Sequence, residues 1–288
     1  MAAKIISIVN NKGGVAKTTS TAFFGEILCL FGKKVLIVDT DESGNLSLLF
    51  DKFFNDEKSV MIGTKEPEHK NVAEIFKYHY RTVEEVKECI YNIRTNLDII
   101  PSSARLRNIP DILLLQSRTS NINNNIILKR ALQTISEEYD YIFIDSAPRN
   151  DILVVNNLIA SDYILIPVRS DGFSLKGFKE VVAEIADLKD EYDIKADFLG
   201  VFQVAAETNT NIYKEINAEY STMLGNKNLP CIRKDVKVNE LLTVVNNSII
   251  NYTASSNVLY DYCMLLLATG ILDKHTEYLI KSAYNIES

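Results

Sequence analysis

Two lysines lie five residues apart near the start of the chain, in the stretch IVNNKGGVAKTTST at residues 8–21. The second of them, Lys17, is followed by Thr18, and these two residue types close the phosphate-binding pattern G-x-x-x-x-G-K-[ST]. The two glycine places of that pattern hold Asn11 and Ala16. The stretch therefore predicts an unusual phosphate-binding loop, in which the standard pattern supplies no role for the first lysine, Lys12.

The position of this loop suits phosphate chemistry. It lies between an apolar run that ends at Val9 and a helical stretch that begins near Lys17, so backbone N–H groups and a helix dipole converge there. Gly13 and Gly14 let the backbone approach phosphates without a Cβ in the way. Lys17 is expected to reach the β- and γ-phosphate oxygens, and the Thr18 hydroxyl to bind Mg²⁺. The alternative is a lysine-rich solvated turn, which the coincidence of strand, double glycine, Lys-Thr and helix disfavours.

Two further segments deliver carboxylates directly after apolar runs. VLIVDTDESGN carries Asp39 and Asp41, and YDYIFIDSAP carries Asp145 in the form of a Walker B strand, whose aspartate orients water on Mg²⁺. An open α/β sheet binds its ligand at such strand ends. We therefore expect the three aspartates near the loop, although a solvated strand-end turn is the alternative for Asp145.

The elements that position these residues are apolar runs, rich in Ile, Val and Tyr, with helical stretches between them. The runs cover residues 5–9, 35–39, 97–100, 141–145, 163–168 and 198–204. Runs that rarely alternate with polar residues are typical of strands buried on both faces, as in parallel sheets. The sequence predicts a doubly wound α/β fold, with a mostly parallel sheet flanked by helices on both faces. One of these helices is expected over residues 18–31 and should end at Gly32.

Composition limits the domain count and the class of protein. No Pro/Gly/Ser-rich linker divides the 288 residues, so we expect a single domain over 1–288, with segments 51–68 and 121–125 as connections. The apolar runs are far shorter than the ~20 residues that span a bilayer, and no signal peptide is recognisable, which predicts a soluble, cytosolic protein. The four cysteines and three histidines have no zinc or charge-relay spacing. A net charge of -7 confines any DNA contact to a local basic patch.

Five segments, in order, carry a resemblance to a known family. NNKGGVAKTT matches the deviant Walker A motif K-G-G-x-x-K-[ST] of the ParA/MinD ATPases. VDTDESGNLS resembles the D-x-D-P-Q-G-N segment of that family, and NLDIIPS its third-strand signature. IASDYILIPVRSDGFSLKGF resembles its next strand and helix, and LPCIRKDVKVNELL resembles the late I-P-R-x-V-R segment of ParA/Soj proteins. Over nearly its whole length, the chain is similar to the ParA branch of these P-loop NTPases.

The resemblance implies a function for the extra lysine. In ParA-like ATPases it contacts the phosphates bound by the other subunit, so Lys12 would help to hold two ATP molecules between two chains. The resemblance also implies that Asp41 positions the attacking water, and that Thr18, Asp39 and Asp145 bind Mg²⁺. The implied catalytic residues of this slow ATPase are Lys12, Lys17 and Asp41. The implied nucleotide contacts are Lys12, Gly13, Gly14, Val15, Ala16, Lys17, Thr18 and Thr19.

The chain departs from the family pattern at several positions. Glu42 and Ser43 replace the usual Pro-Gln, Ala147 replaces the first proline of D-x-P-P, and Cys231 stands where the late motif has proline. The first departure alters the loop that is expected to couple nucleotide state to partner binding.

A basic run near the late motif is the candidate DNA surface, as ParA proteins bind nonspecific DNA as ATP dimers. Its residues are Lys227, Arg233, Lys234 and Lys237, against the single acid Asp235. The alternative is an ordinary solvated surface. Because the chain starts at its first strand, we expect no N-terminal helix-turn-helix extension. A ParB-like centromere-binding partner would then recognise the specific DNA sequence. The protein itself would be cytoplasmic, and nucleoid-associated when ATP-bound.

Three other functions on the same scaffold are less well supported. A MinD-like membrane-surface ATPase needs a basic amphipathic C-terminal helix, but ILDKHTEYLIKSAYNIES has two lysines against Asp273, Glu277 and Glu287, so no membrane contact is expected. The iron protein of nitrogenase needs cluster-binding cysteines, for which Cys89 and Cys231 lack the context. A small-molecule ligase is a remote third possibility.

Overall fold

The computed structural model describes residues 2–53, 69–77, 82–119, 123–169, 174–241, 248–253 and 256–286. The strands are β1 (Lys4–Ile8), β2 (Val35–Asp39), β3 (Tyr91–Arg94), β4 (Leu97–Ile100), β5 (Tyr141–Asp145), β6 (Tyr163–Arg169) and β7 (Asp197–Val204). The first helices are α1 (Lys17–Leu30), α2 (Asn45–Leu49), α4 (Val72–Lys77), α5 (Val83–Lys87), α6 (Ile109–Thr119), α7 (Ile127–Gln133) and α8 (Ile152–Ala160). They are followed by α9 (Ser174–Glu191), α10 (Asn211–Leu224), α11 (Val236–Glu240), α12 (Ile249–Thr253), α13 (Val258–Thr269) and α14 (Lys274–Ala283). Short 3₁₀ helices are η1 (Ala104–Asn108), η2 (Asn124–Ile126), η3 (Ser136–Glu138) and η4 (Gly225–Lys227).

The strands form one seven-stranded sheet in the order β3-β4-β2-β5-β1-β6-β7. All neighbours are parallel except β3 and β4. The predicted doubly wound fold is confirmed, and the six predicted strands agree with the structure to within one residue at each end. Two predicted connections lie largely or partly outside the described residues, namely segment 51–68 and the asparagine cluster 121–125.

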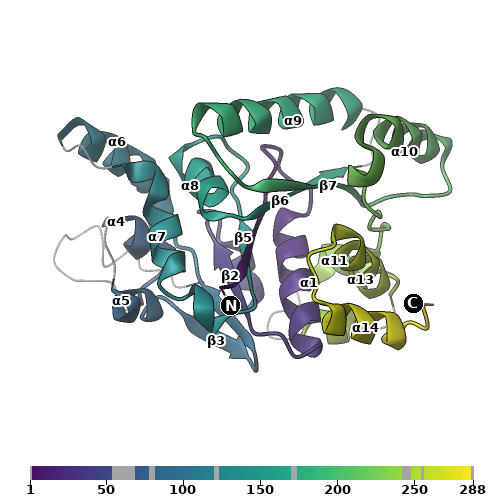
Figure 1. The fold of residues 1–288 in the computed structure, drawn as a ribbon, viewed down its shortest axis with the longest axis horizontal. Helices are drawn as coiled ribbons and strands as arrows, with labels where there is room; N and C mark the ends of the chain where they lie inside the picture. Colours follow the sequence, from purple (N-terminus) through teal and green to yellow (C-terminus); the bar gives the residue numbers. More distant parts are fainter. Residues whose placement is uncertain are drawn as a thin grey trace.

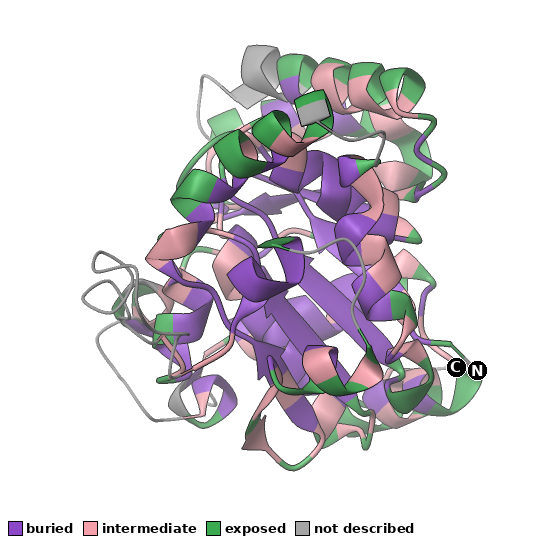
Figure 2. Ribbon diagram, turned by 90° about the vertical axis from the view of Figure 1, so that its left-hand side faces the viewer, coloured by how far each residue is buried: buried purple, intermediate pink, exposed green. Residues whose placement is uncertain are grey.

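Apolar side chains cover both faces of the sheet, as β1 and β5 show. Ile6 and Ile8 pack on one face with Phe143, whereas Ile5 packs on the other with Ile144. The first face is covered by α1 and α11–α14, and the second by α4–α10 (Figure 1). The strands are therefore buried between two helical layers whose outer surfaces are exposed (Figure 2). None of the described helices is long and apolar enough to cross a membrane.

Strand order places a crevice at the carboxyl ends of the central strands. From β1 the chain crosses to β2 on one side of the sheet, and from β5 it crosses to β6 on the other. Loops that leave neighbouring strands in opposite directions open a space between them, where doubly wound proteins bind their ligands. Helix α1 starts at this crevice and ends next to Gly32, whose φ of 78° is the left-handed conformation expected after a helix.

Candidate functional site

Polar side chains within the loop between β1 and α1 hold it in shape. The Asn10 amide donates to the Pro167 carbonyl oxygen at 2.8 Å, and its Oδ1 accepts from the Lys12 N–H at 2.9 Å. The Lys17 ammonium donates to the Lys12 carbonyl oxygen at 2.9 Å, which closes residues 12–17 into a ring. A closed loop of this kind at the start of a helix directs backbone N–H groups towards a bound anion.

The loop backbone adopts left-handed conformations at two positions. Gly14 has φ of 71°, which glycine adopts without strain, and Ala16 has φ of 60°. Ala16 stands where the standard pattern has glycine, and its conformation costs about 1–2 kcal/mol. Ala16 is also the N-cap of α1, and no described side chain caps that helix end, so the first N–H groups of α1 remain available to an anion.

The two lysines of the loop occupy different environments. Lys17 is buried at 6% exposure, and Lys12 is exposed. Burial lowers the pKa of the Lys17 ammonium, although the charges of Asp145 and Asp41 oppose that shift. Within the described ranges, no carboxylate forms an ion pair with the Lys12 ammonium. One lysine therefore points inward to the site, while the other is available to a second molecule.

Two buried carboxylates lie side by side next to the loop. Asp39 and Asp145 are register partners at the ends of β2 and β5, and the Thr18 hydroxyl donates to Asp145 Oδ2 at 2.7 Å. Burial, and then the charge of Asp39, raise the pKa of Asp145 well above its usual value. Asp145 Oδ1 is buried without a hydrogen-bond partner in the described chain. A buried carboxylate oxygen with no hydrogen-bond partner, on one of two neighbouring buried carboxylates, fits a hard cation such as Mg²⁺.

The protein supplies only part of a metal site. The described residues contain no cluster of three or more His, Cys, Asp or Glu side chains that could hold a metal ion. Mg²⁺ usually keeps several waters and binds through one or two protein ligands plus substrate phosphates. The pair of aspartates with Thr18 matches this incomplete type of site.

Asp39 makes the stability of the fold depend on pH. Burial raises its pKa to about 7, against hydrogen bonds from the Ser47 hydroxyl and N–H and from the Asp41 N–H. The unfolded carboxyl has a pKa of about 3.9, so from about pH 4 to 7 the unfolded chain is ionised while folded Asp39 still holds its proton. The contribution of Asp39 to stability must therefore fall as pH rises through this window, by at most ~4 kcal/mol, and level off above it.

Replacing this carboxylate should stabilise the protein that carries no nucleotide. We expect Asp39→Asn to raise the free energy of unfolding by about 2 kcal/mol more at pH 8 than at pH 5, because the amide stays neutral whereas the buried carboxyl has to ionise. The expected gain is smaller than the limit given above because surrounding polar groups screen part of the cost of the buried charge. Urea unfolding at pH 5, 6 and 8 measures this difference. Asp193→Asn, at a side chain with 82% exposure, controls for net charge. A gain that is the same at all three pH values would contradict the assignment.

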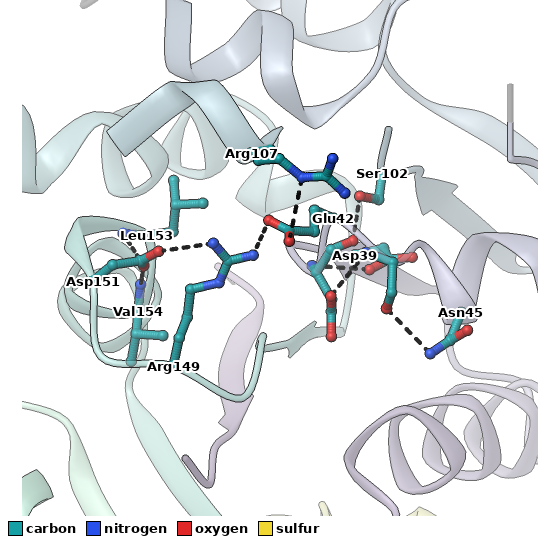
Figure 3. A network of polar contacts seen from close by, with 11 residues as sticks. Asp39, Glu42, Asn45, Ser102, Arg107, Arg149, Asp151, Leu153 and Val154 are labelled. Atoms are coloured by element: carbon teal, nitrogen blue, oxygen red, sulfur yellow. Dashed lines mark hydrogen bonds and ion pairs between the residues drawn. The ribbon is translucent and has the colours of Figure 1, made fainter. Parts of the chain in front are cut away.

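The loop after β2 is fixed by a network that the sequence did not reveal (Figure 3). Asp41 Oδ1 accepts from the Ser43 N–H at 2.9 Å, and the Asp41 carbonyl oxygen accepts from the Ser102 hydroxyl. Glu42, which departs from the family pattern, forms an ion pair with Arg149 in the loop after β5. Its second oxygen lies 3.8 Å from Arg107 Nε of η1. The departure therefore introduces a charged link between three loops.

A cleft of about 750 Å³ opens at this end of the sheet. Its polar part is lined by residues 13–19 of the loop, by residues 41–43, and by Arg149 and Arg169. The lining also includes Arg233, Lys234 and Asp235 and the apolar side chains of Val204, Ala205, Ile232, Val238, Leu241 and Tyr262. A cleft that combines cationic side chains and loop N–H groups with apolar side chains has the chemistry to hold the phosphates and the base of a nucleotide.

Two arginines in this cleft were not among the predicted site residues. Arg149 lies four positions after Asp145, the last residue of β5, and Arg169 is the last residue of β6. A Cβ added at Gly14 would lie 4.0 Å from Arg169 Nη1, so this arginine reaches over the loop. The only signal in the sequence was a cationic residue at the carboxyl end of a buried strand for Arg169, and in the loop after such a strand for Arg149.

Two of the four basic residues predicted to contact DNA form ion pairs with acidic residues of the same chain. Arg233 forms a bidentate ion pair with Asp261, with its Nη2 at 2.6 Å from Oδ1, and its backbone N–H donates to the same carboxylate. Lys234 pairs with Glu207 at 2.5 Å. Arg233 and Lys234 also line the cleft described above.

The four basic side chains are not gathered into one patch. The extended segment 228–233 is joined to β7 and its continuation by two isolated parallel bridges. Because an extended chain rises about 3.3 Å per residue, Lys227 and Arg233 lie roughly 20 Å apart. Lys227 ends η4, and Lys237 lies on α11.

Comparisons with known proteins agree with this architecture. Residues 3–198 match a family described as an AAA domain. The sporulation initiation inhibitor protein Soj of Bacillus subtilis is 31% identical over 209 residues, which cover 73% of this chain and 75% of Soj. The solved structure of apo McdA from Cyanthece has a TM-score of 0.74 at 21% identity and covers 93% of this chain and 99% of its own.

A second solved structure is that of a putative plasmid partition protein from Borrelia burgdorferi bound to AMPPNP. It has a TM-score of 0.70 at 24% identity, over 93% of this chain and 98% of that one. The two structures share the fold, and the identity to Soj extends over most of both sequences. The chain therefore belongs to the ParA/Soj family of partition ATPases.

Proposed function

We propose that this chain is a DNA-partitioning ATPase that binds ATP and Mg²⁺, dimerises around the bound nucleotides and associates with nonspecific DNA. A ParB-like centromere-binding partner would stimulate hydrolysis and so release it from DNA. The observation that carries the proposal is the difference between the two lysines of the loop. Lys17 is buried and its ammonium donates to the Lys12 carbonyl oxygen, whereas the Lys12 ammonium is exposed. Family membership and the AMPPNP bound to the Borrelia protein support ATP as the ligand.

The proposed chemistry needs positioning rather than covalent help. In phosphoryl transfer, charge spreads over the phosphate oxygens, and the protein neutralises it and aligns the attacking water. The Lys17 ammonium would lie against the β- and γ-phosphates, while Thr18 and Asp145 would hold Mg²⁺ with support from Asp39. Mg²⁺ would supply charge neutralisation between the phosphates. Asp41, which lines the cleft beside the loop, would orient the water.

Dimerisation follows from the exposed lysine. An ammonium has three donors and no acceptor, so it binds the phosphates of a facing subunit only while those negative charges are present. A ligand bound chiefly at an interface shifts the equilibrium towards the dimer by mass action, and its cleavage reverses the shift. ATP would thus act as a timer for DNA association, and the protein would be cytoplasmic, with nucleoid association in the ATP state.

DNA binding is proposed to depend on the dimer because one protomer has a net charge of -7 and a dispersed basic set. The ion pairs of Arg233 and Lys234 make Lys227 a stronger candidate for a phosphate contact than either of them. Two copies of each basic residue would act together in a dimer. Neutralisation of phosphates supplies essentially all nonspecific affinity, so binding should weaken steeply with salt.

The test is DNA binding with ATP, ADP and no nucleotide at rising salt. We expect binding with ATP alone, with log K falling linearly against log[salt] at a slope of about -0.9 for each phosphate contacted. Lys227→Ala combined with Lys237→Ala should reduce the slope by about 4 in a dimer. Lys274→Ala, at an exposed position of α14, is the matched control and should leave it unchanged. Binding that is indifferent to salt or to nucleotide would overturn the DNA role.

A membrane-surface function finds no support in the C-terminal helix. Ile280 and Thr276 of α14 are fully buried, and Ile280 belongs to the hydrophobic core that includes α1 and α13. Insertion of this helix into a bilayer would have to remove that core contact. The MinD-like alternative therefore remains the weaker one.

A further inference from the structure

Arg149 lies at the edge of the nucleotide cleft, between two carboxylates. It stands in a tight turn after β5, in which its N–H donates to the Ala147 carbonyl oxygen at 2.9 Å. Its Nη2 pairs with Glu42, and its Nη1 lies 3.5 Å from Asp151 Oδ2. The side chain retains 29% exposure and lines the same cleft as residues 13–19. The guanidinium therefore lines the cleft that contains the phosphate-binding loop and is accessible from it.

The two carboxylates, Asp151 and Glu42, differ in the other contacts that they make. Asp151 is the N-cap of α8, where its Oδ1 accepts from the N–H groups of Leu153 and Val154 at 2.9 and 3.3 Å. Glu42 caps no helix, and within the described residues the only other polar contact of its side chain is the outer one to Arg107 Nε at 3.8 Å. Glu42 is therefore the partner that can release Arg149 without disrupting a helix (Figure 3).

We propose that Arg149 makes the site selective for ATP over ADP, because Glu42 and the terminal phosphate of ATP compete for its guanidinium. This inference rests on the proposed ATP binding, but not on dimerisation or on DNA. A γ-phosphate has more charge than a carboxylate and offers three oxygens to the planar guanidinium fork, so it can displace the carboxylate. ADP has no group in that position and leaves the ion pair intact.

Competition predicts that substitutions of Arg149 and of Glu42 change the Kd for ATP in opposite directions. Arg149→Gln removes the ligand, so the Kd for ATP should rise about tenfold while the Kd for ADP stays the same. Glu42→Gln removes the competitor, so the Kd for ATP should fall severalfold, again with little change for ADP. If the pair only ties two loops together, both variants would weaken both nucleotides in the same direction. The ratio of the two Kd values therefore separates competition from a structural role.

The experiment is calorimetric titration of the full chain with AMPPNP and with ADP in Mg²⁺, at protein concentrations where it is monomeric. Arg107→Gln, which removes the outer contact of Glu42, is the control and should change the ratio by no more than about twofold. Arg149→Lys should restore part of the selectivity, since it keeps the charge but loses the fork. Urea unfolding of each variant confirms that the domain is intact.

Each outcome has one meaning. If the wild-type chain binds neither nucleotide, the proposed function fails. If it binds both and the two variants shift the ratio in the same direction, or not at all, ATP binding stands and the role of Arg149 is overturned. Opposite shifts in the ratio support the inference.

Discussion

Lys12→Ala is expected to abolish the ATP-dependent dimer, while the monomer still binds ATP with an affinity within about threefold of the wild type. The ammonium is exposed and pairs with no carboxylate of the described chain, so its loss costs the protomer little stability. The carbonyl oxygen that holds Lys17 belongs to the backbone and survives the substitution. A symmetric dimer loses two charge-assisted contacts at once, which weakens association by about 10²–10⁴-fold.

Sedimentation velocity with AMPPNP and Mg²⁺ measures this effect, and turnover should fall with the dimer. Lys274→Ala, which removes another exposed lysine, on α14, should dimerise normally. Lys17→Ala is the converse case, because removal of the buried ammonium should abolish ATP binding itself. A Lys12→Ala protein that sediments as the wild-type dimer would show that the exposed lysine does not join the subunits.

The sequence was informative about the fold because burial dictates composition. Strands such as β2 and β5 are buried throughout, so they consist of apolar residues up to the final aspartate, and their ends can be read directly. β3 was missed for the opposite reason. It is a four-residue edge strand, YNIR, that is mostly half-exposed and pairs antiparallel with β4 through a two-residue turn at Asn96, with φ of 63°. Such a strand needs no apolar run.

The site was predictable where its residues are adjacent in sequence to strand ends. Asp39 and Asp145 are register partners because both are the last residues of neighbouring parallel strands, and Thr18 lies in the first turn of α1 beside Asp145. The ion pair of Glu42 and Arg149 joins residues 107 positions apart, so it depends on which loops the topology brings together. A run of basic residues likewise says nothing about distant acids, and only the fold shows that Asp261 engages Arg233.

Asp41→Ala should lower ATP turnover by about 10²–10³-fold and leave the ATP dimer trapped, because loss of a water-positioning carboxylate slows the chemical step without weakening binding. The carboxylate lines the cleft, whereas the carbonyl oxygen that accepts from Ser102 is kept in the variant. The buried Asp39–Asp145 pair is also untouched, so the ability to bind Mg²⁺ and nucleotide should persist. Single-turnover phosphate release measures the chemical step, and sedimentation with ATP shows the dimer.

Asp41→Asn distinguishes chemistry from loop structure. Its amide oxygen can accept from the Ser43 N–H as the carboxylate does, so the loop keeps its 2.9 Å hydrogen bond. The amide has no negative charge with which to polarise a water molecule, and we therefore expect the asparagine variant to be as slow as the alanine variant. If Asp41→Asn recovered the wild-type rate, the carboxylate would serve only to shape the loop, and the attacking water would need another group to orient it.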